Sequence, residues 1–313
     1  MPHVVTPEPY NPQPPAPIIS LAPDILKFRA GQADGKDEIS GYGGLAEGPF
    51  PFYQSGVTMI SNNLSPAEVT RYSLQIAMEG WGREAQERVK SSKVLIVGAD
   101  GLSAAFALHL LTTGVGALRI VDPNRVSLAD LNANPLFRER DLGKNKAAIT
   151  ERRLKEINPF VTVEGQAKTI NEKNVFRVAA GCHLLIETRR DPAGGYLLNQ
   201  AAIRYKLPLL YAWQSGVDGS LATFWPGQGP CLTCAFPDAL PAGSAALMGP
   251  LPGILGALGA LEALRILGGF PAALLGRSLT FQGKFFTFKE ESLPANPVCP
   301  ACGHLYQEQA ARA

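Results

Sequence analysis

The sequence predicts an α/β fold with a mainly parallel sheet, and three features of its 313 residues lead to this expectation. Apolar β-type runs alternate with helix-like stretches from about residue 93 to residue 213, which is the pattern of βαβ units. The first run, 94–97, is apolar throughout and ends in a glycine turn, as expected of a central strand buried on both faces. Two Cys-x-x-Cys pairs then lie in a C-terminal part where the regular alternation of strands and helices ends.

The chain begins with a segment that has no apolar periodicity. Residues 1–63 are rich in proline and glycine, so we expect a largely disordered N-terminal arm. Ser65-Pro66-Ala67-Glu68 then combines an N-cap serine, a proline at the first helical position and a glutamate three residues on. This pattern predicts a helix reaching about Met78, with further turns up to Lys90.

From Lys93 the expected strands and helices alternate regularly. In order they are strand 94–97, helix 102–113, strand 117–121, helix 144–157, strand 161–164, helix 172–179, strand 183–187, helix 196–205 and strand 209–213. Parallel strands joined by helices require right-handed crossovers, so the expected sheet is Rossmann-like and mainly parallel. The stretch 125–142 has no regular pattern.

Beyond Gly219 the pattern predicts a C-terminal layer of mixed strands, 221–225, 278–282 and 285–289, around one apolar helix, 253–267. That helix lies in the most apolar stretch, 247–275, which could suggest a membrane span. The stretch carries Glu262 and Arg265, which we expect to pair one turn apart, and three prolines. A packed core helix is therefore expected.

Composition excludes some classes of partner. Lys plus Arg number 29 and Asp plus Glu 27, so a formal charge of +2 gives no electrostatic reason to expect nucleic acid or a membrane surface. The first residues lack the basic and apolar regions of a signal peptide, and we expect a cytoplasmic protein.

The turn after the first strand has the geometry of a phosphate site. Gly98 and Gly101 allow a tight turn, and the following helix directs its free N–H groups above the strand. In the usual dinucleotide pattern the second and third glycines stand where this chain has Asp100 and Ser103. Asp122, at the end of the second strand, is expected to bind ribose hydroxyls, or alternatively to initiate a turn.

The cysteines predict a metal site. Each Cys-x-x-Cys can offer two thiolates, so Cys231, Cys234, Cys299 and Cys302 predict a closed structural zinc site that staples the C-terminus to the body. Cys182 is left over. Without a signal peptide, a reducing compartment and metal binding are favoured over disulfides.

Short motifs along the chain form a series that resembles the ThiF/MoeB/HesA adenylyltransferases, relatives of ubiquitin-activating enzymes. In chain order they are Arg71-Tyr72-Ser73; Val94 to Gly98 with Gly101-Leu102; Gly114-Val115-Gly116; Val121-Asp122; Asp141-Leu142-Gly143-Lys144-x-Lys146-Ala147; Ile157-Asn158-Pro159; Tyr196-Leu197-Leu198-Asn199; Gly229-Pro230-Cys231-x-x-Cys234; Pro252-Gly253-Ile254 with Ala260-Leu261-Glu262-Ala263-Leu264; and Cys299-Pro300-x-Cys302-Gly303.

The resemblance implies an adenylyltransferase domain over residues 64–303, followed by a tail, 304–313. It implies a homodimer that binds ATP and Mg²⁺ and adenylates the C-terminus of a ubiquitin-like sulfur-carrier protein or peptide. Lys146 would then be the catalytic lysine that binds the phosphates, Asp122 would bind ribose, and Gly98 and Gly101 would form the phosphate turn.

Several positions depart from the family pattern. Two expected arginines are Leu74 and Ala133, and a glycine facing the phosphates is Asp100. The metal-binding aspartate falls on Arg190, although a one-residue slip would supply Asp191 instead and let Arg190 contact phosphate. Because both charge changes face one pocket, we expect Asp100 and Arg190 to pair within about 6 Å.

Two functions therefore stay open. The first is ATP-dependent adenylation. The second is a degenerate family member that lacks this activity and serves as a dimer partner, carrier-binding module or scaffold. NAD-linked oxidoreduction ranks third, because no dehydrogenase pattern combines the glycine turn with the split cysteine pairs.

Overall fold

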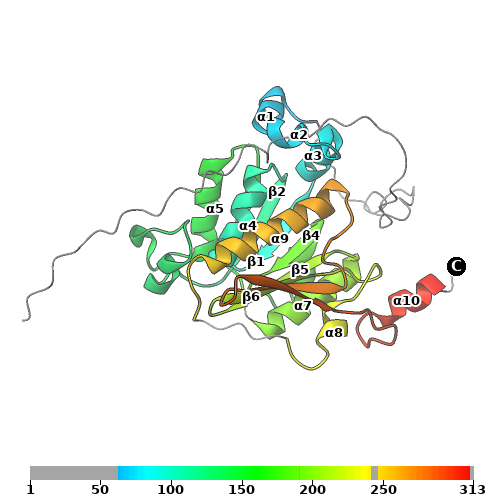
Figure 1. Ribbon diagram of the computed structural model, residues 1–313. Coiled ribbons are helices and arrows are strands. Elements are labelled where there is room, and N and C mark those ends of the chain that lie inside the picture. The colour runs from blue at the N-terminus through cyan, green and yellow to red at the C-terminus, as the bar shows by residue number, and fades with distance from the viewer. Residues whose placement is uncertain (1–62, 190, 241–245, 311–313) are drawn as a thin grey trace, which may run out of the picture. The chain divides into compact units, whose positions relative to one another are not determined.

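The computed structural model describes residues 63–189, 191–240 and 246–310. Within them, eight strands form one sheet in the order β3-β2-β1-β4-β5-β6-β7-β8 (Figure 1). The first five are parallel and the last three join as antiparallel neighbours. The strands are β1 (Lys93–Val97), β2 (Ala117–Val121), β3 (Thr162–Gln166), β4 (Leu184–Glu187), β5 (Leu209–Ser215), β6 (Asp218–Phe224), β7 (Arg277–Gln282) and β8 (Thr287–Ser292).

The helices follow the predicted alternation, with additional short elements. They are α1 (Pro66–Arg71), α2 (Ser73–Ile76), α3 (Gly82–Lys90), α4 (Gly101–Thr112), α5 (Lys146–Ile157), α6 (Val175–Ala179), α7 (Pro192–Tyr205), α8 (Leu232–Ala235), α9 (Leu251–Gly268) and α10 (Gly303–Ala310). The stretch expected to be irregular holds two 3₁₀ turns, η3 (Leu128–Asn132) and η4 (Glu139–Asp141). The expected tail includes most of α10.

The central strands β1 and β4 are buried on both faces of the sheet, since successive side chains point in opposite directions and almost all of them are buried. In β1, Val94 and Ile96 join the core under α4, α5 and α9, whereas Leu95 and Val97 join the core under α6 and α7. The predicted α/β fold with a parallel sheet and a C-terminal mixed-strand layer is confirmed. Strand order reverses between β1 and β4, and in such sheets ligands bind where the order reverses, at the carboxyl ends.

Helix α9 lies alongside α4 across one face of the sheet (Figure 1). The two helices approach closely at two glycines of α9. A Cβ at Gly256 would lie 2.3 Å from the Cβ of Ala105, and one at Gly259 would lie 2.1 Å from the Phe106 ring, so glycine at these positions allows the approach. By length and composition α9 could cross a membrane, but 67% of it is buried inside the protein. The expected core helix is confirmed.

The predicted pair between Glu262 and Arg265 is wrong. Glu262 is buried and accepts hydrogen bonds from Thr223 Oγ1 (2.9 Å), Ala273 N (3.0 Å) and Leu274 N (2.8 Å). These donors come from β6 and from the chain after α9, so Glu262 fixes the C-terminal layer to the helix. Arg265 Nη2 instead donates to Pro271 O (3.3 Å).

Candidate functional site

The glycine turn follows β1 as predicted and lies beside the end of β4. Gly98 has φ +121°, and a Cβ there would lie 2.4 Å from Thr188 Oγ1. Thr188 Oγ1 lies 2.5 Å from Ser103 Oγ in α4 and donates to Val97 O (3.2 Å). Glycine is therefore required both by backbone conformation and by the packing of the turn against β4.

Asp122 lies against this turn. The side chain is 3% exposed; Oδ2 accepts from Ala99 N (2.9 Å) and Oδ1 from Asn124 N (2.7 Å). The bond from Asn124 N to Oδ1 is the side-chain-to-backbone bond of a turn, as expected if Asp122 initiates a turn. Each carboxylate oxygen has a further lone pair, so these bonds leave acceptor capacity.

Asp100 is the N-cap of α4. Its Oδ1 accepts from Ser103 N (2.9 Å) and lies 3.0 Å from Ser103 Oγ. A carboxylate thus lies at the positive end of a 12-residue helix, where the amide groups and helix dipole would otherwise favour an external anion.

The loop that follows η3 contacts the glycine turn through Ala133 and Asn134. Asn134 Nδ2 donates to Ala99 O (3.2 Å) and Asp100 O (3.1 Å). A Cβ at Gly101 would lie 2.4 Å from Ala133 O, so this glycine admits the loop backbone. Ala133, where an arginine was expected, therefore packs through its backbone against the turn.

Lys146 begins α5 beside Asp122. Its backbone N donates to Asn124 O (2.9 Å), and its Nζ lies 2.5 Å from Asp130 Oδ1 in η3. Sequence reasoning missed Asp130, although Ser127-x-x-Asp130 is a capping-box pattern that marks a turn at this position.

The end of β4 carries a buried acid that sequence reasoning also missed. Glu187 is fully buried, Oε1 accepts from Arg189 N (2.6 Å), and Oε2 has no hydrogen-bond partner among the described residues. Burial raises the Glu187 pKa well above its usual value; Arg189 opposes the shift and nearby carboxylates add to it. Burial therefore favours the neutral form of Glu187 over the ionised form.

Asp191 is the N-cap residue of α7, and its Oδ2 lies 3.8 Å from Arg189 Nη2. Arg190 lies outside the described residues, so the expected pair between Asp100 and Arg190 stays a prediction.

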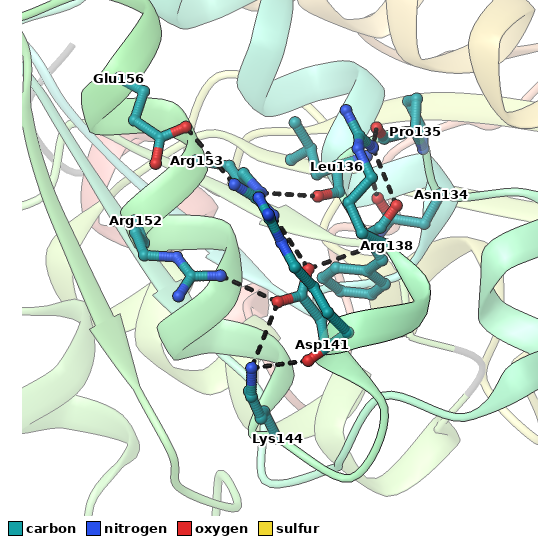
Figure 2. Close-up of polar contacts among 11 residues, drawn as sticks. Asn134, Pro135, Leu136, Arg138, Asp141, Lys144, Arg152, Arg153 and Glu156 are labelled. Atoms are coloured by element: carbon teal, nitrogen blue, oxygen red, sulfur yellow. Dashed lines mark hydrogen bonds and ion pairs between the residues drawn. The ribbon is translucent and has the colours of Figure 1, made fainter.

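Asp141, from the Asp-Leu-Gly-Lys motif, organises the loop that leads into Lys146 (Figure 2). It is fully buried; its carboxylate binds Arg152 (2.9 Å) and Arg153 (3.1 Å) of α5 and accepts from Arg138 N (3.2 Å). Burial alone would raise the Asp141 pKa, but the bonds from Arg153, Arg138 and Arg152 outweigh it and hold the pKa below its usual value.

Other motif residues are structural. Asn158 Nδ2 donates to Tyr72 Oη (3.0 Å) and to Leu111 O (2.7 Å), and a Cβ at Gly114 would lie 2.4 Å from the Tyr72 ring. Three motif residues that are far apart in the sequence, Tyr72, Gly114 and Asn158, therefore pack together. Leu74, where another arginine was expected, is 89% exposed on α2.

The four predicted cysteines come together. All four Sγ atoms lie within 4.8 Å of one another, with separations of 3.8 Å for Cys231 and Cys299, 3.7 Å for Cys231 and Cys234, and 3.4 Å for Cys234 and Cys302. Tetrahedral zinc with Zn–S bonds of about 2.3 Å places sulfur atoms about 3.8 Å apart. The thiols therefore fit such an ion. Cys182 is buried elsewhere, and burial raises its pKa to about 11.

Fold and site together define a Rossmann-type α/β protein with a glycine turn at the strand-order reversal and a four-cysteine cluster that could hold a metal ion. The ThiF family matches residues 72–301, and the chain belongs to this family.

Similar curated proteins include a sulfur carrier protein adenylyltransferase and a HesA protein. The sulfur carrier protein adenylyltransferase of Thermus thermophilus is 32% identical, with 75% of this chain and 91% of that protein covered. The vegetative HesA protein of Trichormus variabilis is 34% identical, with 77% and 92% covered. The crystal structure of E. coli MccB with MccA-N7isoASN has a TM-score of 0.68 at 21% identity, covering 77% of this chain and 76% of that one, and supports the fold alone.

Proposed function

We propose that this protein is an ATP-dependent adenylyltransferase that activates the C-terminus of a ubiquitin-like sulfur-carrier protein or peptide. One observation carries the proposal: the ThiF match over residues 72–301 includes the glycine turn, Asp122, whose Oδ2 accepts from Ala99 N in that turn, and Lys146, whose backbone N donates to Asn124 O. A carboxylate oxygen of the carrier would attack the α-phosphorus of ATP. The bond from that phosphorus to the bridging oxygen breaks, and pyrophosphate leaves from an acyl adenylate.

Each residue has a role that its surroundings support. Gly98 and Gly101 form the phosphate turn, Asp122 accepts hydrogen bonds from ribose, and Lys146 stabilises phosphate charge, which accumulates as pyrophosphate leaves. Asp191, whose side chain is 38% exposed, would bind Mg²⁺. Arg190, which lies outside the described residues, would contact phosphate.

A second candidate is a family member without adenylation activity, acting as a dimer partner, carrier-binding module or scaffold. Asp100 favours this candidate, because its carboxylate caps α4 where a phosphate would otherwise bind. Leu74 and Ala133 add no charge to stabilise a triphosphate.

Exchange of labelled pyrophosphate into ATP separates the two candidates. The probe is a small ubiquitin-like protein that ends in Gly-Gly, and Lys146→Ala is the reference. We expect carrier-dependent exchange that exceeds the variant by about 100-fold, the size of one lost charge-stabilising group. Exchange that never exceeds the variant, with carrier binding intact, would favour the second candidate.

We further propose that the four-cysteine site holds structural zinc, and that the protein works as a homodimer in the reducing cytoplasm. Four thiolates leave no open coordination position, as in structural zinc sites. Exposed apolar side chains support this interface: Leu74 on α2, Met78 just after α2, and Leu261 on α9.

Metal analysis should find one zinc per chain in the purified protein and well under one in Cys234→Ser. Sedimentation equilibrium should give twice the chain mass. A monomer holding zinc would overturn the dimer and leave the metal site in place.

A further inference from the structure

The ammonium group of Lys146 is held by an internal carboxylate. Its Nζ lies 2.5 Å from Asp130 Oδ1, and the two side chains are only 12% and 17% exposed. Two elements that are adjacent in space but separated in sequence, η3 and the start of α5, are joined by this contact. Among the described residues this contact uses one of the three donors on the ammonium group, and a ligand could accept from the others.

Asp130 is itself fixed on its other side. Oδ2 accepts from Ser127 N (2.8 Å) and Ser127 Oγ (2.7 Å), so donors converge on both oxygens. An amide could not replace it, because asparagine has one oxygen acceptor and would turn an NH₂ group toward one set of donors.

The loop that carries Asp130 also holds the glycine turn. Asn134 N donates to Asp130 O (3.0 Å), and the Asn134 side chain donates to Ala99 O and Asp100 O. Asp130 thus fixes Lys146 relative to the turn, since both contacts come from one short segment.

We propose that Asp130 is the positioning residue for Lys146: it holds the ammonium group in a fixed place relative to the glycine turn before nucleotide binds. The contact stands on the geometry alone, whereas its effect on turnover rests on the proposed adenylation. An anchored lysine meets the phosphates without a search through side-chain conformations, and losing that placement costs about 10- to 100-fold in rate.

The first test measures the contact without activity. The full-length protein is acetylated with N-hydroxysuccinimidyl acetate, and labelling of Lys146 is followed by mass spectrometry. Asp130→Asn should raise the labelling rate of Lys146 at least about fivefold, because its nitrogen is released from a partly buried pair. Glu84→Gln, which removes the acid from the exposed Glu84–Arg88 pair on α3, is the matched control and should leave Lys146 labelling unchanged.

The second test measures exchange of labelled pyrophosphate. Asp130→Asn should lower kcat about 10-fold or more with a smaller change in KM for ATP, and Asp130→Glu, which restores a carboxylate, should recover part of the loss. A general loss of folding would not be rescued in this way. If Asp130→Asn does not fold, Ser127→Ala, which loosens Asp130, takes its place with a smaller expected rise in labelling.

Unchanged Lys146 labelling in the folded variant would overturn the positioning role. An inactive wild-type protein would refute the proposed adenylation, and the labelling result would still decide whether Asp130 holds Lys146.

Discussion

At the scale of single residues, carboxyl groups near the glycine turn differ in what their oxygens contact. Asp122 binds two backbone N–H groups of neighbouring turns, Asp100 caps α4, and Glu187 is buried with one oxygen unpaired among the described residues. The contacts of Asp122 are compatible with ribose binding, whereas Asp100 places negative charge where phosphate would bind.

Replacing Asp100 tests whether that charge opposes nucleotide binding. Asp100→Asn keeps an N-cap side chain and removes the charge, so we expect ATP to bind several-fold more tightly by calorimetry. Stability should change by less than about 1 kcal/mol, since asparagine caps helices as well as aspartate. Equal or weaker ATP binding in the folded variant would show that Asp100 does not oppose the phosphates.

Glu187 should make stability depend on pH. Its pKa is raised in the folded state, so both states are protonated below the ordinary carboxyl pKa and no penalty exists there. As pH rises above that value the unfolded state ionises first, and stability falls by about 1.4 kcal/mol per pH unit until Glu187 also ionises in the folded state.

Glu187→Gln removes this ionisation. Urea unfolding at pH 5 and pH 7 should therefore show the variant gaining stability relative to wild type as pH rises. A stability difference that is the same at both pH values would contradict the raised pKa of Glu187.

At the scale of elements, the loop between β2 and α5 is organised by one buried carboxylate. Asp141 joins η4 to two arginines in the middle of α5, and the same loop leads directly into Lys146 (Figure 2). The loop is therefore held at two points, Asp130 and Asp141.

Asp141→Asn should destabilise the protein by about 2–3 kcal/mol, because Arg153 loses its buried carboxylate partner, while Arg152 is half exposed and can turn to water. Glu156→Gln is the matched control: it removes an exposed partner of Arg153 and should change stability by less than about 0.5 kcal/mol. Urea unfolding measures both. Equal effects of the two substitutions would argue that Asp141 is not the organising residue.

At the scale of the whole molecule, the sequence predicted the features that rest on local patterns. Strand β2 begins and ends where the apolar run predicted, and the cysteine pairs met as their spacing indicated. The capping box predicted the start of α1 at Pro66. These features depend on side-chain alternation, turn residues or ligand chemistry, which neighbouring residues express directly.

The features that the sequence did not predict depend on contacts between distant segments. Glu262 bonds to β6 and to the chain after α9 instead of Arg265, and the partner of Lys146 comes from a 3₁₀ turn sixteen residues earlier. The buried position of Glu187 follows from pairing of β4 between β1 and β5. Only tertiary structure determines such contacts.

The mass of the carrier after incubation with ATP and Mg²⁺ tests the central proposal most directly. The account predicts that intact-mass spectrometry finds the carrier with AMP attached to its C-terminus in the presence of this protein, and not with Lys146→Ala. A carrier that binds this protein but gains no AMP, with no pyrophosphate released, would contradict adenylation and identify a binding module built on the same fold.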